Sequence, residues 1–229
     1  MVFNEQKINM KVMQLRKETN RRELIDFYLN IENDKKDKEI PSDYNSLDWN
    51  NANELDCWLL NNGYKRGVIS GFKKWAYVKL SKDDILDLAI SDSIPQFKNK
   101  GQRLRDLMDT KEFMAWKPNK DPLPIWYDSL SKGVFDEKFS IIMRPACESE
   151  KRQGTKFYIE DGTGRALCYL RSILKLNKES EMLGFIGYAP DQESIFLQKE
   201  LDEEFSKENC RNYLTIELLE IACSRKLTR

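Results

Sequence analysis

Residues 157–170, FYIEDGTGRALCYL, decide the fold that we predict for this chain. An apolar, aromatic run ends at Asp161, glycines follow at 162 and 164, and an apolar helical pattern begins near Arg165. A strand, a glycine turn and a helix in this order place free main-chain N–H groups at the positive end of the helix dipole. The segment therefore predicts a strand–turn–helix unit whose turn can bind an anion.

The residues of this turn suit a phosphate group. Gly162 and Gly164 let a phosphate approach the main chain around Thr163, and Arg165 adds a forked, charged donor. Asp161 can orient Arg165, hold a ribose hydroxyl or bind Mg²⁺ through one oxygen. The spacing matches neither a P-loop nor a dinucleotide fingerprint. A purely structural turn, with Asp161 as a helix cap and Arg165 on the surface, is the alternative interpretation.

Strand and helix patterns alternate along the rest of the chain, which predicts an α+β (mixed α/β) fold. We predict strands over 75–80, 123–127, 139–144, 155–160 and 182–188. We predict helices over 20–31, 54–60, 83–90, 104–113, from 165 onward and over 195–205. Asn20, Asn53 and Ser81 are expected to cap the helices that follow them. Residues 1–71 then form a helical N-terminal extension, and residues 72–229 form the core with C-terminal helices.

Composition excludes several classes of protein. The 38 basic and 38 acidic side chains among 229 residues balance, which argues against a nucleic-acid binder driven by a charged tail. Histidine is absent, so catalysis by Ser-His-Asp or Cys-His groups and metal sites containing histidine are excluded.

The five cysteines follow no C-x-x-C spacing, and the N-terminus has no signal-peptide pattern. We therefore expect a reduced, soluble, cytoplasmic protein without a membrane partner, in which Cys147 and Cys168 are packing residues.

A resemblance adds to this interpretation. The strand followed by Asp161-Gly162-x-x-Arg165 at the start of an Ala/Leu-rich helix resembles the ParB/sulfiredoxin-like superfamily. Pro124-Ile125-Trp126 looks like the Pro-Ile-x strand of the family, and the segments 75–80 and 81–86 look like its opening strand and helix. The resemblance spans about residues 75–190. It implies a ParB/sulfiredoxin-like nucleotide-binding core over 72–229, in which the turn and its arginine hold nucleotide phosphates.

Departures from the family narrow the choice among its branches. Sulfiredoxins carry a catalytic cysteine and a histidine in this turn, where Thr163 and Gly164 stand here. Partition-type members carry a further arginine and a DNA-binding helical domain, but only residues 191–229 follow the core. Free-standing amino-acid kinases and nuclease-like members remain. In the kinase branch an acidic residue after the opening strand is the base, which points to Asp83 or Asp84 although the family has glutamate there.

The leading function is therefore binding of ATP or a related nucleoside triphosphate with Mg²⁺, and phosphorylation of a small hydroxyl compound such as a free amino acid. The expected catalytic residues are Asp83, Asp84 and Asp161, and Asp161 is also the expected metal ligand. The expected nucleotide-binding residues are Gly162, Thr163, Gly164, Arg165, Arg144, Lys151 and Arg152, the last three from a loop that can fold over the turn. Ser81 to Asp84 equally form a capping box without catalytic meaning.

Nucleic acid is the alternative partner. Lys98, Lys100, Arg103 and Arg105 are interleaved with aromatic residues, as in nucleic-acid surfaces. Acidic residues interrupt this segment, so an ordinary solvated helix face explains it as well. A third possibility is a non-catalytic interaction module whose glycine turn is purely structural.

Overall fold

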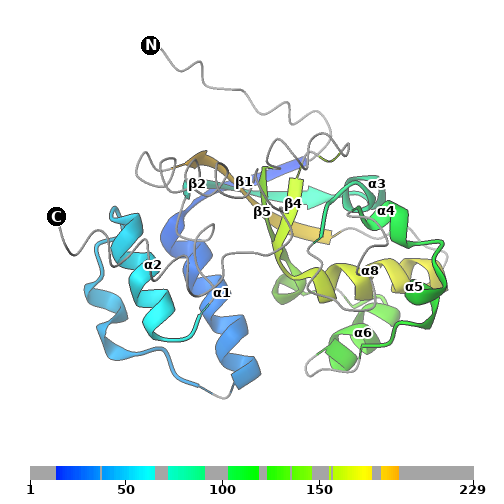
Figure 1. Ribbon diagram of the computed structural model, residues 1–229, viewed down its shortest axis with the longest axis horizontal. Coiled ribbons are helices and arrows are strands. Elements are labelled where there is room, and N and C mark those ends of the chain that lie inside the picture. The colour runs from blue at the N-terminus through cyan, green and yellow to red at the C-terminus, as the bar shows by residue number, and fades with distance from the viewer. Residues whose placement is uncertain are drawn as a thin grey trace, which may run out of the picture.

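The computed structural model describes residues 14–36, 38–64, 72–90, 103–118, 123–134, 136–145, 155, 157–176 and 182–190. Its elements in chain order are β1 (Gln14–Asn20), α1 (Arg21–Lys36), η1 (Ser42–Ser46), α2 (Ala52–Asn61), β2 (Phe72–Leu80), α3 (Lys82–Leu86), α4 (Leu104–Leu107), α5 (Lys111–Ala115), α6 (Leu123–Ser131), η3 (Glu137–Phe139), β3 (Ile141–Pro145), β4 (Phe157–Asp161), α8 (Thr163–Leu176) and β5 (Met182–Pro190). Helices and one mixed sheet confirm the α+β class (Figure 1).

The sheet has the strand order β1-β2-β5-β3-β4. Among the five described strands, β3 and β5 run parallel, and the other neighbours are antiparallel. The predicted strands over 75–80, 139–144, 155–160 and 182–188 correspond to β2, β3, β4 and β5, with ends shifted by a few residues. These four strands are found because each is a short β-branched or aromatic run between turn residues.

Helices cover the sheet on two sides and create two apolar cores. Trp75 and Tyr77 of β2 pack with α1 and α2 in a core that is rich in aromatic side chains. The alternate residues of β2, Ala76 and Val78, pack with α6 and α8 in the other core. Figure 1 shows α1 and α2 at the left and α3 to α8 at the right. Successive side chains of β2 thus point to opposite faces of the sheet and contribute alternately to the two cores.

The N-terminal segment supplies a strand that the sequence analysis does not predict. β1 pairs antiparallel with β2, from Gln14 opposite Lys79 to Asn20 opposite Lys74. Its charged residues Arg16, Lys17 and Glu18 are exposed, as edge strands tolerate, and this polar composition hides the strand pattern. The predicted helical extension therefore shares a sheet with the core across residue 72.

The segment 123–127 is a helix, so the predicted strand there is wrong. Trp126 and Leu130, four residues apart, are buried, whereas Ile125 is 64% exposed. Pro124 lies in the first turn of α6, where its missing N–H breaks no helical bond. Helical periodicity outweighs the aromatic, β-branched composition. The Pro124-Ile125-Trp126 segment consequently gives no support to the family resemblance.

The expected helix caps are largely found. The side-chain oxygen of Asn20 accepts a hydrogen bond from Glu23 N at 3.0 Å, and Ser81 and Asp84 form a complete capping box. The cap of α2 is Asn51 rather than Asn53, because the helix begins two residues earlier than predicted.

Three predicted helices differ in extent or cannot be compared. Thr110 caps α5 and so divides the predicted helix 104–113 into α4 and α5. The predicted helix 83–90 ends at Leu86, because Ala89 pairs with β4 instead. The predicted helix 195–205 lies outside the described residues. Within the described ranges, no helix combines the length and apolar character that crossing a membrane requires.

Candidate functional site

The glycine turn lies between the end of β4 and the start of α8, as the sequence predicts. Gly162 has a φ of 98°, in the left-handed region, and its carbonyl accepts the Ala166 N–H at 2.9 Å. A Cβ on Gly162 would lie 2.8 Å from Ile141 Cγ2 and 2.9 Å from Arg165 Nε. Glycine is therefore required here both for its backbone conformation and for the space it leaves to Arg165.

Arg165 turns inward and lies beneath this turn. The residue is only 1% exposed, and its guanidinium donates to the Asp161 carboxylate and, at 3.2 Å, to the Lys138 carbonyl. The centre of the guanidinium is 5.6 Å from the centroid of the Trp126 ring. Burial lowers the pKa of Arg165, opposed mainly by the nearby Asp161 charge. The sequence suggests that Arg165 lies on the surface or contacts a phosphate, whereas its side chain supports the turn from inside.

The part of the turn that can meet a ligand is main chain. Residues 161–164 are half-buried, and the first N–H groups of a helix have no acceptor within it. Those of Thr163 and Gly164 belong to the first turn of α8, whose 14 residues give it a full helix dipole. Together with the Thr163 hydroxyl they form a small set of donors for an anion.

Arg144 is also held by a carboxylate. Its Nε donates to Glu160 Oε2 at 3.4 Å, and its guanidinium stacks 4.2 Å from the centroid of the Tyr158 ring. Glu160 is 2% exposed and Arg144 is 8% exposed. Arg144 Nη1 donates to the Pro145 carbonyl at 3.1 Å, so protein groups engage both of these donors.

A register shift places two carboxylates in succession at the end of β4. Ile142 pairs with Asp161 but Met143 pairs with Ile159, so Glu160 is the extra residue of a bulge. Glu160 holds Arg144 and Asp161 holds Arg165. Two buried ion pairs therefore hold the end of β4, beside the glycine turn. The sequence does not reveal these two ion pairs, because each arginine could equally be exposed.

The two candidate bases have different environments. Asp84 Oδ2 accepts from Ser81 N at 2.8 Å and from Ser81 Oγ at 2.7 Å, while its buried Oδ1 has no hydrogen-bond partner. The Asp83 side chain is 84% exposed and lies 3.7 Å from Arg105 Nη2. The capping-box interpretation of Ser81 to Asp84 is thus confirmed, and only Asp84 has an oriented carboxylate with one oxygen left over.

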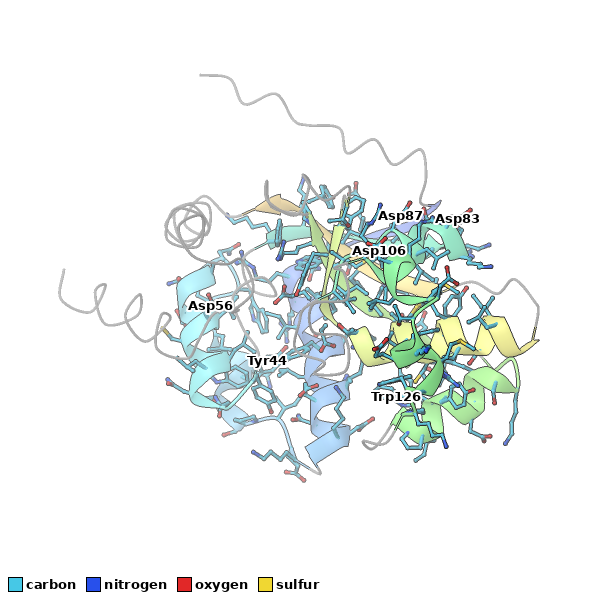
Figure 2. The ribbon with its side chains drawn as sticks, turned by 45° about the vertical axis from the view of Figure 1, so that its right-hand side comes forward. Tyr44, Asp56, Asp83, Asp87, Asp106 and Trp126 are labelled. Atoms are coloured by element: carbon cyan, nitrogen blue, oxygen red, sulfur yellow. The ribbon has the colours of Figure 1, made fainter. Side chains whose placement is uncertain are left out.

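The structure does not bring these aspartates to the glycine turn. After α3, Ala89 N donates to Phe157 O at 3.0 Å, and Thr155 Oγ1 donates to Asp87 O at 2.7 Å. α3 therefore leads to the beginning of β4, whereas the turn follows the end of that strand. Figure 2 shows Asp83 and Asp87 close together and Trp126, which contacts Arg165, well apart from them.

The described part of the basic segment is neutralised by acidic neighbours. Arg103 makes two bonds to Asp106, at 3.0 and 2.9 Å, which lower the pKa of the Asp106 carboxyl. Arg105 Nε donates to Asp87 at 2.9 Å. Both arginines thus belong to mixed-charge pairs. Lys98, Lys100, Lys151 and Arg152 lie outside the described residues.

Metal ligands and thiols add little to the site. Among the residues that the structure describes, no group of three or more acidic or cysteine side chains is arranged to hold a metal ion. Asp161 has one oxygen on Arg165, so it can offer Mg²⁺ a single ligand at most. Burial raises the pKa of the Cys168 thiol to about 12, in line with a packing role, while Cys147 lies outside the described residues.

Comparison of the chain with protein-family models, with curated proteins and with solved structures finds no match.

Proposed function

We propose that this protein binds a nucleotide, ATP or a related triphosphate, through its phosphates at the β4–α8 turn. One observation carries the proposal: the half-buried turn at the start of a 14-residue helix is fixed from below by Arg165 and Asp161. A rigid set of main-chain donors at the positive end of a helix dipole is a suitable phosphate site. The resemblance of Asp161-Gly162-x-x-Arg165 to a nucleotide-binding family points to the same ligand class.

The roles of the residues follow from their partners. The N–H groups of Thr163 and Gly164 and the Thr163 hydroxyl contact the phosphate in this proposal. Arg165 acts as a support, because Asp161 and the Lys138 carbonyl already accept its hydrogen bonds. Mg²⁺ enters with the triphosphate, since this ion is commonly held by phosphate oxygens, waters and one or two carboxylates. In this proposal Asp161, the last residue of β4, is the carboxylate that joins them.

The proposal concerns binding. Phosphoryl transfer to a hydroxyl compound needs a base within hydrogen-bond reach of the acceptor. Asp84 has a suitable carboxylate, but α3 lies beside the start of β4 rather than at the turn. A nucleic-acid function has less support, because Arg103 and Arg105 are each paired with an aspartate.

Titration calorimetry with Mg·ATP on the parent and on Thr163→Asp tests the proposal. An aspartate in the first helical turn interacts favourably with the helix dipole but repels a phosphate. We expect Thr163→Asp to keep or raise the melting temperature and to weaken binding at least about tenfold, the factor given by 1.4 kcal/mol.

Thr163→Val is the matched control, because it removes only the hydroxyl and keeps the shape of the side chain. Its affinity should fall less than that of Thr163→Asp. Equal ATP affinity of the parent and Thr163→Asp would place the nucleotide elsewhere, and a parent that binds no nucleotide contradicts the proposal.

A further inference from the structure

The C-terminal part of α1 reaches the support of the glycine turn. The Trp126 ring, 7% exposed, has Arg165 Cζ at 5.6 Å and Lys35 Nζ at 5.8 Å from its centroid. Ile31, one turn before Lys35, packs in the same core as Trp126. Most of the apolar residues of α1 pack in the other core, so α1 crosses from one core to the other at this end.

Glu32 acts on both cations. Its carboxylate lies 2.5 Å from Lys35 Nζ, and the two side chains are only 15% and 25% exposed. The same carboxylate is one of the charges that raise the pKa of Arg165 against the effect of burial. A charge this poorly solvated interacts strongly with its neighbours. Two cations, Arg165 and Lys35, thus lie over one tryptophan, and each is paired with a carboxylate, Asp161 or Glu32.

We infer that Glu32 and Lys35 are positioning residues for the β4–α8 turn, acting through Arg165 and Trp126. The space around Arg165 is tight, because a single methyl on Gly162 would already lie 2.9 Å from its Nε. A shift of the guanidinium is therefore transmitted to the turn. The N-terminal helix, which the sequence presents as an extension, is in this way a working part of the site.

Hydrogen exchange at the start of α8 tests this inference without any ligand. The Ala166 N–H, which donates to Gly162 O at 2.9 Å, reports directly on the turn. We expect Glu32→Gln and Lys35→Met to speed exchange of this amide roughly five- to thirtyfold, while amides in the β2–β5 ladder stay unchanged. Lys35→Arg, which keeps a cation beside Trp126, should exchange this amide at the rate of the parent.

An exposed pair of the same chemistry provides the control. Lys132 and Asp128 also lie 2.5 Å apart, with side chains 67% and 61% exposed. Asp128→Asn and Lys132→Met should leave exchange at Ala166 unchanged. The inference is wrong if Glu32→Gln leaves that rate unchanged, or if exchange rises in parallel at Ala166 and in the β2–β5 ladder.

A consequence for the ligand rests on the proposed function. Coupling between two sites is reciprocal, so Mg·ATP at the turn should slow exchange in the last turn of α1. Failure of the parent to bind ATP, together with faster exchange at Ala166 in Glu32→Gln, would overturn the function and leave the positioning role standing. ATP binding by the parent, together with unchanged exchange at Ala166 in Glu32→Gln, would support the function and overturn the positioning role.

Discussion

Replacing Gly162 by alanine tests the support of the turn by Arg165, and Gly133 provides a matched control. Both glycines have positive φ, 98° and 77°. A Cβ on Gly133 meets nothing within 4 Å, whereas one on Gly162 meets Ile141 at 2.8 Å and Arg165 Nε at 2.9 Å. The two substitutions therefore share the backbone strain and differ in the contact.

The magnitude follows from these two contributions. A left-handed conformation costs an L-residue about 1–2 kcal/mol, and the smaller entropy of the unfolded alanine chain offsets about 0.4–1 kcal/mol of it. Gly133→Ala should thus lower the free energy of unfolding by about 1 kcal/mol. Overpacking against Ile141 and the buried guanidinium adds about 1–3 kcal/mol for Gly162→Ala.

Urea unfolding of the parent and both variants measures the difference. The slope of the free energy against urea should stay constant, so that the midpoints report stability alone. We expect Gly162→Ala to be less stable than Gly133→Ala by more than about 1 kcal/mol. Equal losses in the two variants would show that Arg165 does not lie beneath Gly162, and the account of the turn would fail.

Three further predictions concern α3 and the Cys168 thiol. Asp84→Ala should lower the free energy of unfolding by about 0.5–2 kcal/mol, because the capping box with Ser81 is lost, and Asp83→Ala should lower it much less. Since neither residue lies at the turn, calorimetry should find the ATP affinity of both variants nearly unchanged. A large loss of affinity would place α3 in the site. Alkylation followed by peptide mass spectrometry should leave Cys168 intact until about pH 12, because burial raises the pKa of its thiol. Rapid labelling of Cys168 at pH 9 would contradict its burial. The raised pKa of Cys168 also makes stability depend on pH. Its contribution to the free energy of unfolding is present below pH 9 and is lost as pH rises to about 12, and Cys168→Ala should abolish this pH dependence.

Features encoded by neighbouring residues were predictable from the sequence. The strand, glycine turn and helix around Gly162 lie within one continuous segment, and the caps at Asn20 and Ser81 use side chains three residues from their partners. β1 was missed because an edge strand needs no apolar alternation, and its polar residues match no strand pattern.

The environment of the site depends on residues distant in the chain. Arg165 is buried because Trp126, Lys138 and Ile141 come together around it, and none of these contacts is local in sequence. The helix that carries Trp126 was predicted as a strand, since a short aromatic, β-branched run is ambiguous between the two until its partners are known. The sequence could therefore locate the turn but not the direction in which Arg165 points.

Amide NMR during a titration with Mg·ATP tests the central claim most directly. We predict saturable shifts of the Thr163 and Gly164 resonances, with the amide of Gly133, in an exposed turn, unchanged. Saturable shifts confined to residues of α3 and α4, with Thr163 and Gly164 unmoved, would contradict it, and so would the absence of any saturable shift.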